Sequence, residues 1–203
     1  MTTEGQIARE TTPDWVVADM PSGYHNRLAE IQRLTADLQS MGKFGQLLTG
    51  TGSALGDIVR DLFASLHMEA SLLEGVGATG VTVRLQGRGR LLLHVSADAD
   101  PVQKKSPEVA HVFQMLHELA EEQDRVVLVT NIDPATRPGE RRQPLTDEAT
   151  SFLRRLGVTH VTAPMLFALW KLSLPEPERA REQVQRLHGH EGGTFELPAS
   201  ARV

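Results

Sequence analysis

The sequence predicts an α/β domain whose mixed central sheet is flanked by helices and preceded by an amphipathic helix. Two strand-like stretches, 81–85 and 90–96, enclose a glycine-containing turn, which is typical of an antiparallel hairpin. The stretches 91–95 and 125–131 are nearly continuous in apolar residues, as expected for strands covered on both faces. Helical patterns separate the later strands, and this alternation indicates layers of helices on a sheet.

Composition limits the functions that the chain can perform. Its 203 residues suit one domain with an appendage, and a hydrophobic fraction of 40% suffices for a core. A net charge of -5 argues against bulk electrostatic binding of nucleic acid. The lack of cysteine excludes disulfides and thiol catalysis. Since we find neither a signal peptide nor an apolar run of ~20 residues, we expect a cytoplasmic protein without a membrane segment.

We expect four segments along the chain. Residues 1–22 are polar and interrupted by prolines, which predicts a mobile tail. An amphipathic helix, with the potential to form a coiled coil, occupies 23–45. The α/β domain extends over 46–198, and a short tail at 199–203 ends the sequence.

The helix predicted within 23–45 carries an apolar stripe. Its members lie three or four residues apart and are Leu28, Ile31, Leu34, Leu38 and Met41. The last four follow the three-four spacing of a coiled-coil seam, over about two heptads. The stripe has two interpretations: it covers a face of its own domain, or it is an interface with a second copy of the chain or another protein.

The remaining elements follow from apolar spacing and from helix start and stop signals. Helices are expected at 55–66, 107–119, 147–156, 166–172 and 176–187, and further strands at 158–162 and 193–197. Four acidic residues near the end of the second of these helices, Glu118, Glu121, Glu122 and Asp124, are expected on a solvated face.

Three motifs occur in a defined order. A Leu-Leu-x-x-x-Gly-x-x-Leu pattern occupies 47–55, and Asn131 ends a buried strand before a Pro-x-x-Arg loop that contains Arg141. The strand 158–162 then ends in threonine shortly before a helix. In this order, over roughly three quarters of the chain, they resemble the PD-(D/E)xK nuclease superfamily, in the bacterial branch with a leading coiled helix. The resemblance implies a restriction-endonuclease-like sheet flanked by helices.

The resemblance also implies a metal site that this chain has lost. In the family, an acid on the hairpin's first strand and an acid two residues before a lysine bind a divalent metal that activates water. The first position falls within 79–83, which has no carboxylate, and the other two hold His94 and Ser96. We therefore expect a catalytically inactive nuclease-like domain without metal or cofactor, acting as a protein-interaction or assembly module, as a homodimer or with another protein.

In a second interpretation the chain is an active enzyme whose metal ligands occupy other positions. Asp98 and Asp100 follow the strand, Lys104 and Lys105 precede the next helix, and Glu108 lies in its first turn. If these side chains converge, they form a migrated site for Mg²⁺ or Mn²⁺, and the chain is a divalent-metal-dependent nuclease. The competing interpretation is an ordinary polar turn at 98–101, held by local hydrogen bonds.

A third interpretation makes the chain a sensor of a nucleotide or a signalling phosphate. The loop after the second buried strand gathers polar and basic groups that suit phosphate. They are Asn131, Arg137, Arg141 and Arg142, with His94 as a further candidate. The competing interpretation makes Arg141 a structural residue and pairs the other arginines with surface acids.

Overall fold

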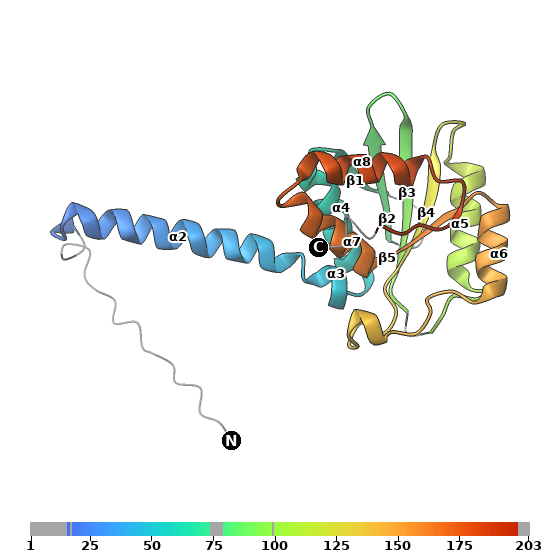
Figure 1. Ribbon diagram of the computed structural model, residues 1–203, viewed down its shortest axis with the longest axis horizontal. Helices are drawn as coiled ribbons and strands as arrows, with labels where there is room; N and C mark the ends of the chain where they lie inside the picture. The colour runs from blue at the N-terminus through green and yellow to red at the C-terminus, as the bar shows by residue number, and fades with distance from the viewer. Residues whose placement is uncertain (1–15, 17, 74–78, 99, 199–203) are drawn as a thin grey trace, which may run out of the picture. The chain divides into compact units, whose positions relative to one another are not determined.

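The computed structural model describes residues 16, 18–73, 79–98 and 100–198 (Figure 1). Most of the expected N-terminal tail and all of the C-terminal tail lie outside these residues. The contacts divide the chain into a first unit, Met1–Met41, and an α/β unit, Gly42–Val203. Among the described helices, none has the length and apolar composition to cross a bilayer.

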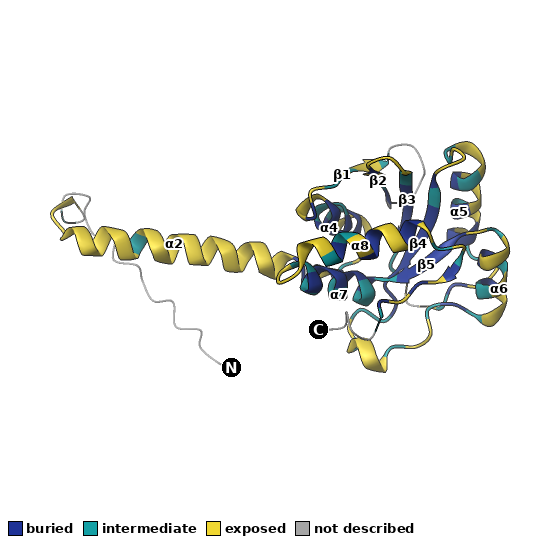
Figure 2. Ribbon diagram, turned by 45° about the horizontal axis from the view of Figure 1, so that its top comes forward, coloured by how far each residue is buried: buried dark blue, intermediate teal, exposed yellow. Residues whose placement is uncertain are grey.

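The first unit contains most of α2 (Ser22–Lys43), the leading helix that the sequence predicts. Leu, Ala, Glu, Gln and Arg, which favour helix, make up much of its sequence. Figure 2 colours nearly all of this helix as exposed, and none of its residues is buried. Ile31, Leu34, Leu38 and Met41 are exposed, while Leu28 is half-buried.

The α/β unit is built on a six-stranded mixed sheet, which confirms the predicted fold class. The strands are β1 (Glu69–Leu73), β2 (Thr79–Leu85), β3 (Gly89–Ser96), β4 (Arg125–Thr130), β5 (Thr159–Thr162) and β6 (Gly193–Thr194). They lie side by side in sequence order, antiparallel from β1 to β3 and parallel from β3 to β6. The edge strand β1 was not expected, and β6 is shorter than the predicted 193–197.

Helices cover both faces of this sheet (Figure 1). The first face carries α3 (Gln46–Thr49), α4 (Gly52–Ser65), α7 (Ala163–Ser173) and α8 (Pro177–His188), and the second carries α5 (Pro107–Glu118) and α6 (Asp147–Arg155). Along β3, Leu91, Leu93 and Val95 join the first cluster, and Leu92 joins the second. This burial on two sides explains why the predicted central strands lack a polar face.

The turn between β2 and β3 depends on two glycines with positive φ. Gly87 has φ +71° and open space around the position of a Cβ atom. Gly89 has φ +90°, and a Cβ atom there would lie 2.6 Å from the carbonyl oxygen of Gln123. Gly87 is therefore needed for backbone conformation alone, whereas Gly89 also permits close approach of Gln123, in the turn between α5 and β4.

We predict that Gly89→Ala destabilises the α/β unit more than Gly87→Ala. Gly87→Ala adds only the strain of a left-handed conformation, about 1 kcal/mol. Gly89→Ala adds a backbone collision, so we expect about 2–4 kcal/mol. Urea unfolding of both variants measures the difference, and equal losses would contradict the role of the Gln123 contact.

Candidate functional site

The candidate site lies at the carboxyl end of β3, where it runs beside β2 and β4. His94 pairs with Gly80 on β2 and with Leu128 on β4. Ser96, two residues on, pairs with Thr130. Because alternate residues of a strand share a face, His94 and Ser96 point toward the face covered by α5. The register thus sets Gly80, within the stretch 79–83, beside His94, with Ser96 two residues further along β3.

His94 is buried inside the protein. Only 2% of its surface is exposed, and its ring centroid lies 5.0 Å from that of His111 on α5. Burial, and then the charge of His111, lower the pKa of His94 to about 4. Its Nδ1 atom has no hydrogen-bond partner among the described residues. At neutral pH His94 is therefore an uncharged ring that fills space between β3 and α5.

Ser96 belongs to a small cluster of oxygens. Its Oγ lies 3.3 Å from Glu108 Oε1 and 3.4 Å from Asp98 Oδ2, so its single hydrogen serves one carboxylate at a time. Burial and a hydrogen bond with Asp98 raise the pKa of Glu108. Both causes disfavour the charged form of Glu108.

The other candidates for a migrated metal site have separate partners. Asp100 Oδ1 lies 3.6 Å from Arg142 Nη1. Lys104 Nζ lies 3.5 Å from Glu148 Oε1 and 5.5 Å from the ring centroid of Phe152. Lys105 is exposed. Within the described ranges, no three His, Asp or Glu side chains come together as metal ligands. Asp98 and Glu108 do come together, since both lie within 3.4 Å of Ser96 Oγ.

Arg141 forms a partly buried polar connection between the loop and α3. Its Nη1 donates to Asn131 Oδ1 at 2.6 Å, and its Nη2 donates to the Leu48 carbonyl oxygen, also at 2.6 Å. Nε donates to the Thr136 carbonyl oxygen at 2.9 Å. Asn131 Nδ2 in turn donates to the Gly50 carbonyl oxygen at 2.9 Å. These contacts satisfy the carbonyl groups at the end of α3, so Arg141 and Asn131 stabilise the packing of the loop against α3.

The arginine loop borders a pocket of about 260 Å³ at the carboxyl ends of β4 and β5. Arg141 and Arg142 line it, with Thr130, Thr162 and several proline and aliphatic residues. Arg142 also donates to Asp133, with its Nε 2.9 Å from Oδ2. Arg137 is exposed and is not among the lining residues. His94 does not line this pocket either, so the structure does not bring it together with the arginine loop.

His160 is a polar core residue that the sequence analysis missed. It is fully buried on β5, with Nε2 2.9 Å from Thr130 Oγ1 and Nδ1 3.4 Å from Thr194 Oγ1. Burial lowers its pKa to about 4. The ring thus connects β4, β5 and β6. Its place in a short strand of β-branched residues, Thr159, Val161 and Thr162, was the signal that could have indicated burial.

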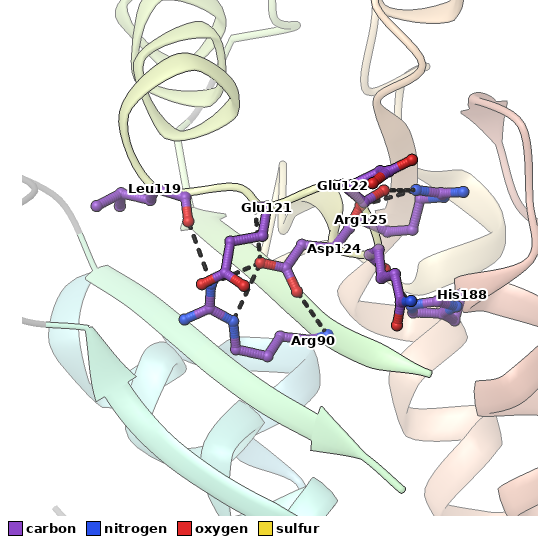
Figure 3. A network of polar contacts seen from close by, with 8 residues as sticks. Arg90, Leu119, Glu121, Glu122, Asp124, Arg125 and His188 are labelled. Carbon is purple, nitrogen blue, oxygen red and sulfur yellow. Dashed lines mark hydrogen bonds and ion pairs between the residues drawn. The ribbon is translucent and has the colours of Figure 1, made fainter. Parts of the chain in front are cut away.

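A second polar network holds the opposite end of the sheet, at the starts of β3 and β4 (Figure 3). The backbone N–H of Arg90 donates to Asp124 Oδ1 at 2.8 Å, and its guanidinium Nη2 donates to Oδ2 at 2.6 Å. Burial opposes ionisation of Asp124, but the Arg90 hydrogen bonds outweigh it and lower its pKa. His188 Nε2 donates to the Gln123 carbonyl oxygen at 3.0 Å. The expectation that Asp124 lies on a solvated face was wrong. Its carboxylate is buried and binds Arg90, where β3 and β4 begin side by side.

Comparison with known proteins gives one distant structural likeness. No family model matches the sequence, and no curated protein matches it. The MspJI restriction endonuclease, solved in complex with a 27-mer oligonucleotide, is similar over 88% of this chain, with 12% sequence identity and a TM-score of 0.33. This chain covers 39% of the length of that protein. The fold class of this protein is α/β, with a six-stranded mixed sheet between two layers of helices.

We predict that His94 makes the unfolding free energy depend on pH below about 6.5. In that range the unfolded chain binds a proton that buried His94 takes up only near pH 4, so stability is lost as pH falls. Glu108, with its raised pKa, acts in the opposite direction. Replacing His94 by leucine should remove roughly 1–2 kcal/mol of the stability difference between about pH 7.5 and about pH 5.

Urea unfolding of the parent and His94→Leu at the two pH values measures this effect. His25→Leu, which changes an exposed histidine of α2, is the matched control and should retain the parent dependence. An unchanged pH dependence in His94→Leu would contradict burial of a neutral ring.

We predict that Arg141→Lys costs more stability than Arg142→Lys. An ammonium group cannot reproduce the three-point contact of the Arg141 guanidinium with Asn131, Leu48 and Thr136, so we expect a loss of about 2–3 kcal/mol. Arg142 is exposed, and its substitution should cost less than about 1 kcal/mol. Chemical denaturation measures both, and equal small losses would show that Arg141 is not structural.

Proposed function

We propose that this chain is a nuclease-like domain that has lost its metal site and serves as an assembly module. The observation that carries the proposal is the packing at the former metal positions. Gly80 offers no side chain, His94 is buried against His111, and Ser96 offers a neutral hydroxyl. A divalent metal needs charged oxygen ligands, and these three positions supply none.

The order of elements supports the nuclease-like part of the proposal. A helix, an antiparallel three-stranded meander, a second helix and a parallel strand follow one another as α4, β1, β2, β3, α5 and β4. The sequence motifs fit this order, since Asn131 and Arg141 lie just after β4. The loop contacts of Arg141 explain why that motif would persist without catalysis, because it holds α3 and the loop together.

The leading helix supports the assembly part of the proposal. Ile31 and Leu38 expose 61% and 69% of their surface, and they lie on the same stripe as Leu34 and Met41. Exposed apolar stripes of this kind are typical of interfaces between proteins. A homodimer formed through α2 is the simplest assembly, because each copy supplies the same surface.

A nuclease with a migrated site is the second candidate function. Asp98 and Glu108 favour it, since two carboxyl groups lie beside Ser96 at the carboxyl end of the strand. Such a site would use Mg²⁺ or Mn²⁺, with these two carboxylates as ligands. Metal binding would have to outweigh the burial that raises the pKa of Glu108, because a metal ligand must be an ionised carboxylate.

We predict no metal-dependent cleavage of nucleic acid by the purified chain. Plasmid DNA, linear DNA and single-stranded RNA are incubated with Mg²⁺ or Mn²⁺, and products are separated on gels. Asp98→Asn and Glu108→Gln are compared with the parent, and Asp147→Asn, an exposed acid on α6, is the matched control. Cleavage that both site variants abolish and the control retains would establish the migrated nuclease and overturn the proposal.

A further inference from the structure

The apolar stripe of α2 has the a and d spacing of a coiled coil, and its first heptad has the residue pattern of a two-stranded parallel one. In the heptad lettering abcdefg, with a and d on the seam, Ile31 and Leu38 occupy a, and Leu34 and Met41 occupy d. A β-branched residue at a followed by leucine at d favours two parallel strands, and Ile31 with Leu34 has this arrangement. Towards the N-terminus the seam ends at Arg27, the next d position, where a charge replaces the apolar side chain.

The charges that flank the seam distinguish parallel from antiparallel pairing. The g positions hold Glu30 and Asp37, and the e positions hold Thr35 and Gly42. In a parallel pair g side chains approach e side chains of the partner, so each acid meets a neutral residue. An antiparallel pair that matches Ile31 with Met41 and Leu34 with Leu38 brings the two copies of Asp37 together across the two-fold axis.

The ion pair within α2 does not remove this difference. Arg33 Nη1 lies 3.0 Å from Asp37 Oδ2, and both side chains are more than half exposed. Exposed pairs of this kind contribute little, so they offset only part of a repulsion between two like charges. The flanking charges therefore favour the parallel arrangement.

We propose that two copies of this chain pair through α2 in parallel and in register, over Ile31 to Met41. The inference rests on the proposed assembly function and names its partner, a second copy, and its orientation. Both chains then continue into Gly42 at the same end of the coiled coil, so both α/β units are joined to that end.

Cysteine cross-linking in the full chain tests the orientation, because the native sequence has no cysteine. Ile31→Cys and Met41→Cys are each oxidised alone, and in a mixture in which one variant carries a C-terminal tag. In a parallel pair each variant cross-links with itself, since a disulfide needs Cα atoms about 4.4–6.8 Å apart. The mixture gives no product joining positions 31 and 41, which lie about 15 Å apart along the helix.

Ala36→Cys places the thiol on the outer f position of the same exposed helix and is the matched control, which should stay uncross-linked. Sedimentation equilibrium of the parent chain, with Leu34→Asn as a seam variant that should shift the mass toward the monomer, gives the oligomeric state independently.

The outcomes separate the orientation from the assembly function. A dimer in which Ile31→Cys and Met41→Cys each cross-link with themselves supports the inference. A dimer with only the mixed product, which joins position 31 of one copy to position 41 of the other, is antiparallel and overturns the orientation alone. A dimer without cross-links at either position pairs through another surface and overturns the role of α2 while assembly stands. A monomeric parent chain overturns both the pairing and the homodimer from which it is argued, whereas the nuclease assay bears on neither.

Discussion

Burial of β3 on both faces is the constraint on which the rest of the structure depends. Its apolar residues contact α4 on one side and α5 on the other. Its parallel pairing with β4 keeps water from the strand, so an unpaired charge there would be costly. A carboxylate at His94 would lose its hydration there unless a metal or cationic partner accompanied it. A neutral ring against His111 avoids that cost. The same burial that stabilises the sheet therefore disfavours an uncompensated charge at this position.

Much of the fold could be predicted because periodicity reports burial directly. The hairpin, the two central strands and the leading helix carry clear patterns of period 2, continuous apolar character and period 3.6. The strand Glu69–Leu73 was missed because an edge strand with polar and small residues lacks such a pattern. Asp124 and Arg90 were missed as a pair because they lie far apart in sequence, and only the parallel pairing of β3 with β4 brings them together.

The position of the candidate site at the end of a strand was predictable, but the side chains that surround it were not. The motif order located His94 and Ser96 at the end of a strand, and the register sets Gly80 opposite His94. The approach of His111 to His94 could not be read from spacing, since it depends on how α5 lies across the sheet. Arg141 was ambiguous for a similar reason: a guanidinium suits a phosphate and three protein oxygens equally well, and only the fold supplies the oxygens.

The edge strand β1 has a consequence for the behaviour of concentrated protein. Its outer N–H and C=O groups have no neighbouring strand in the described part of the chain. Glu69 is the single charge in Glu69–Leu73, and Arg84 lies 3.3 Å from it. Many sheets protect such an edge with lysine or proline, and this one has neither. Aggregation of this chain during expression is therefore expected to start by strand addition at β1, with the exposed Leu72 contributing an adhesive contact.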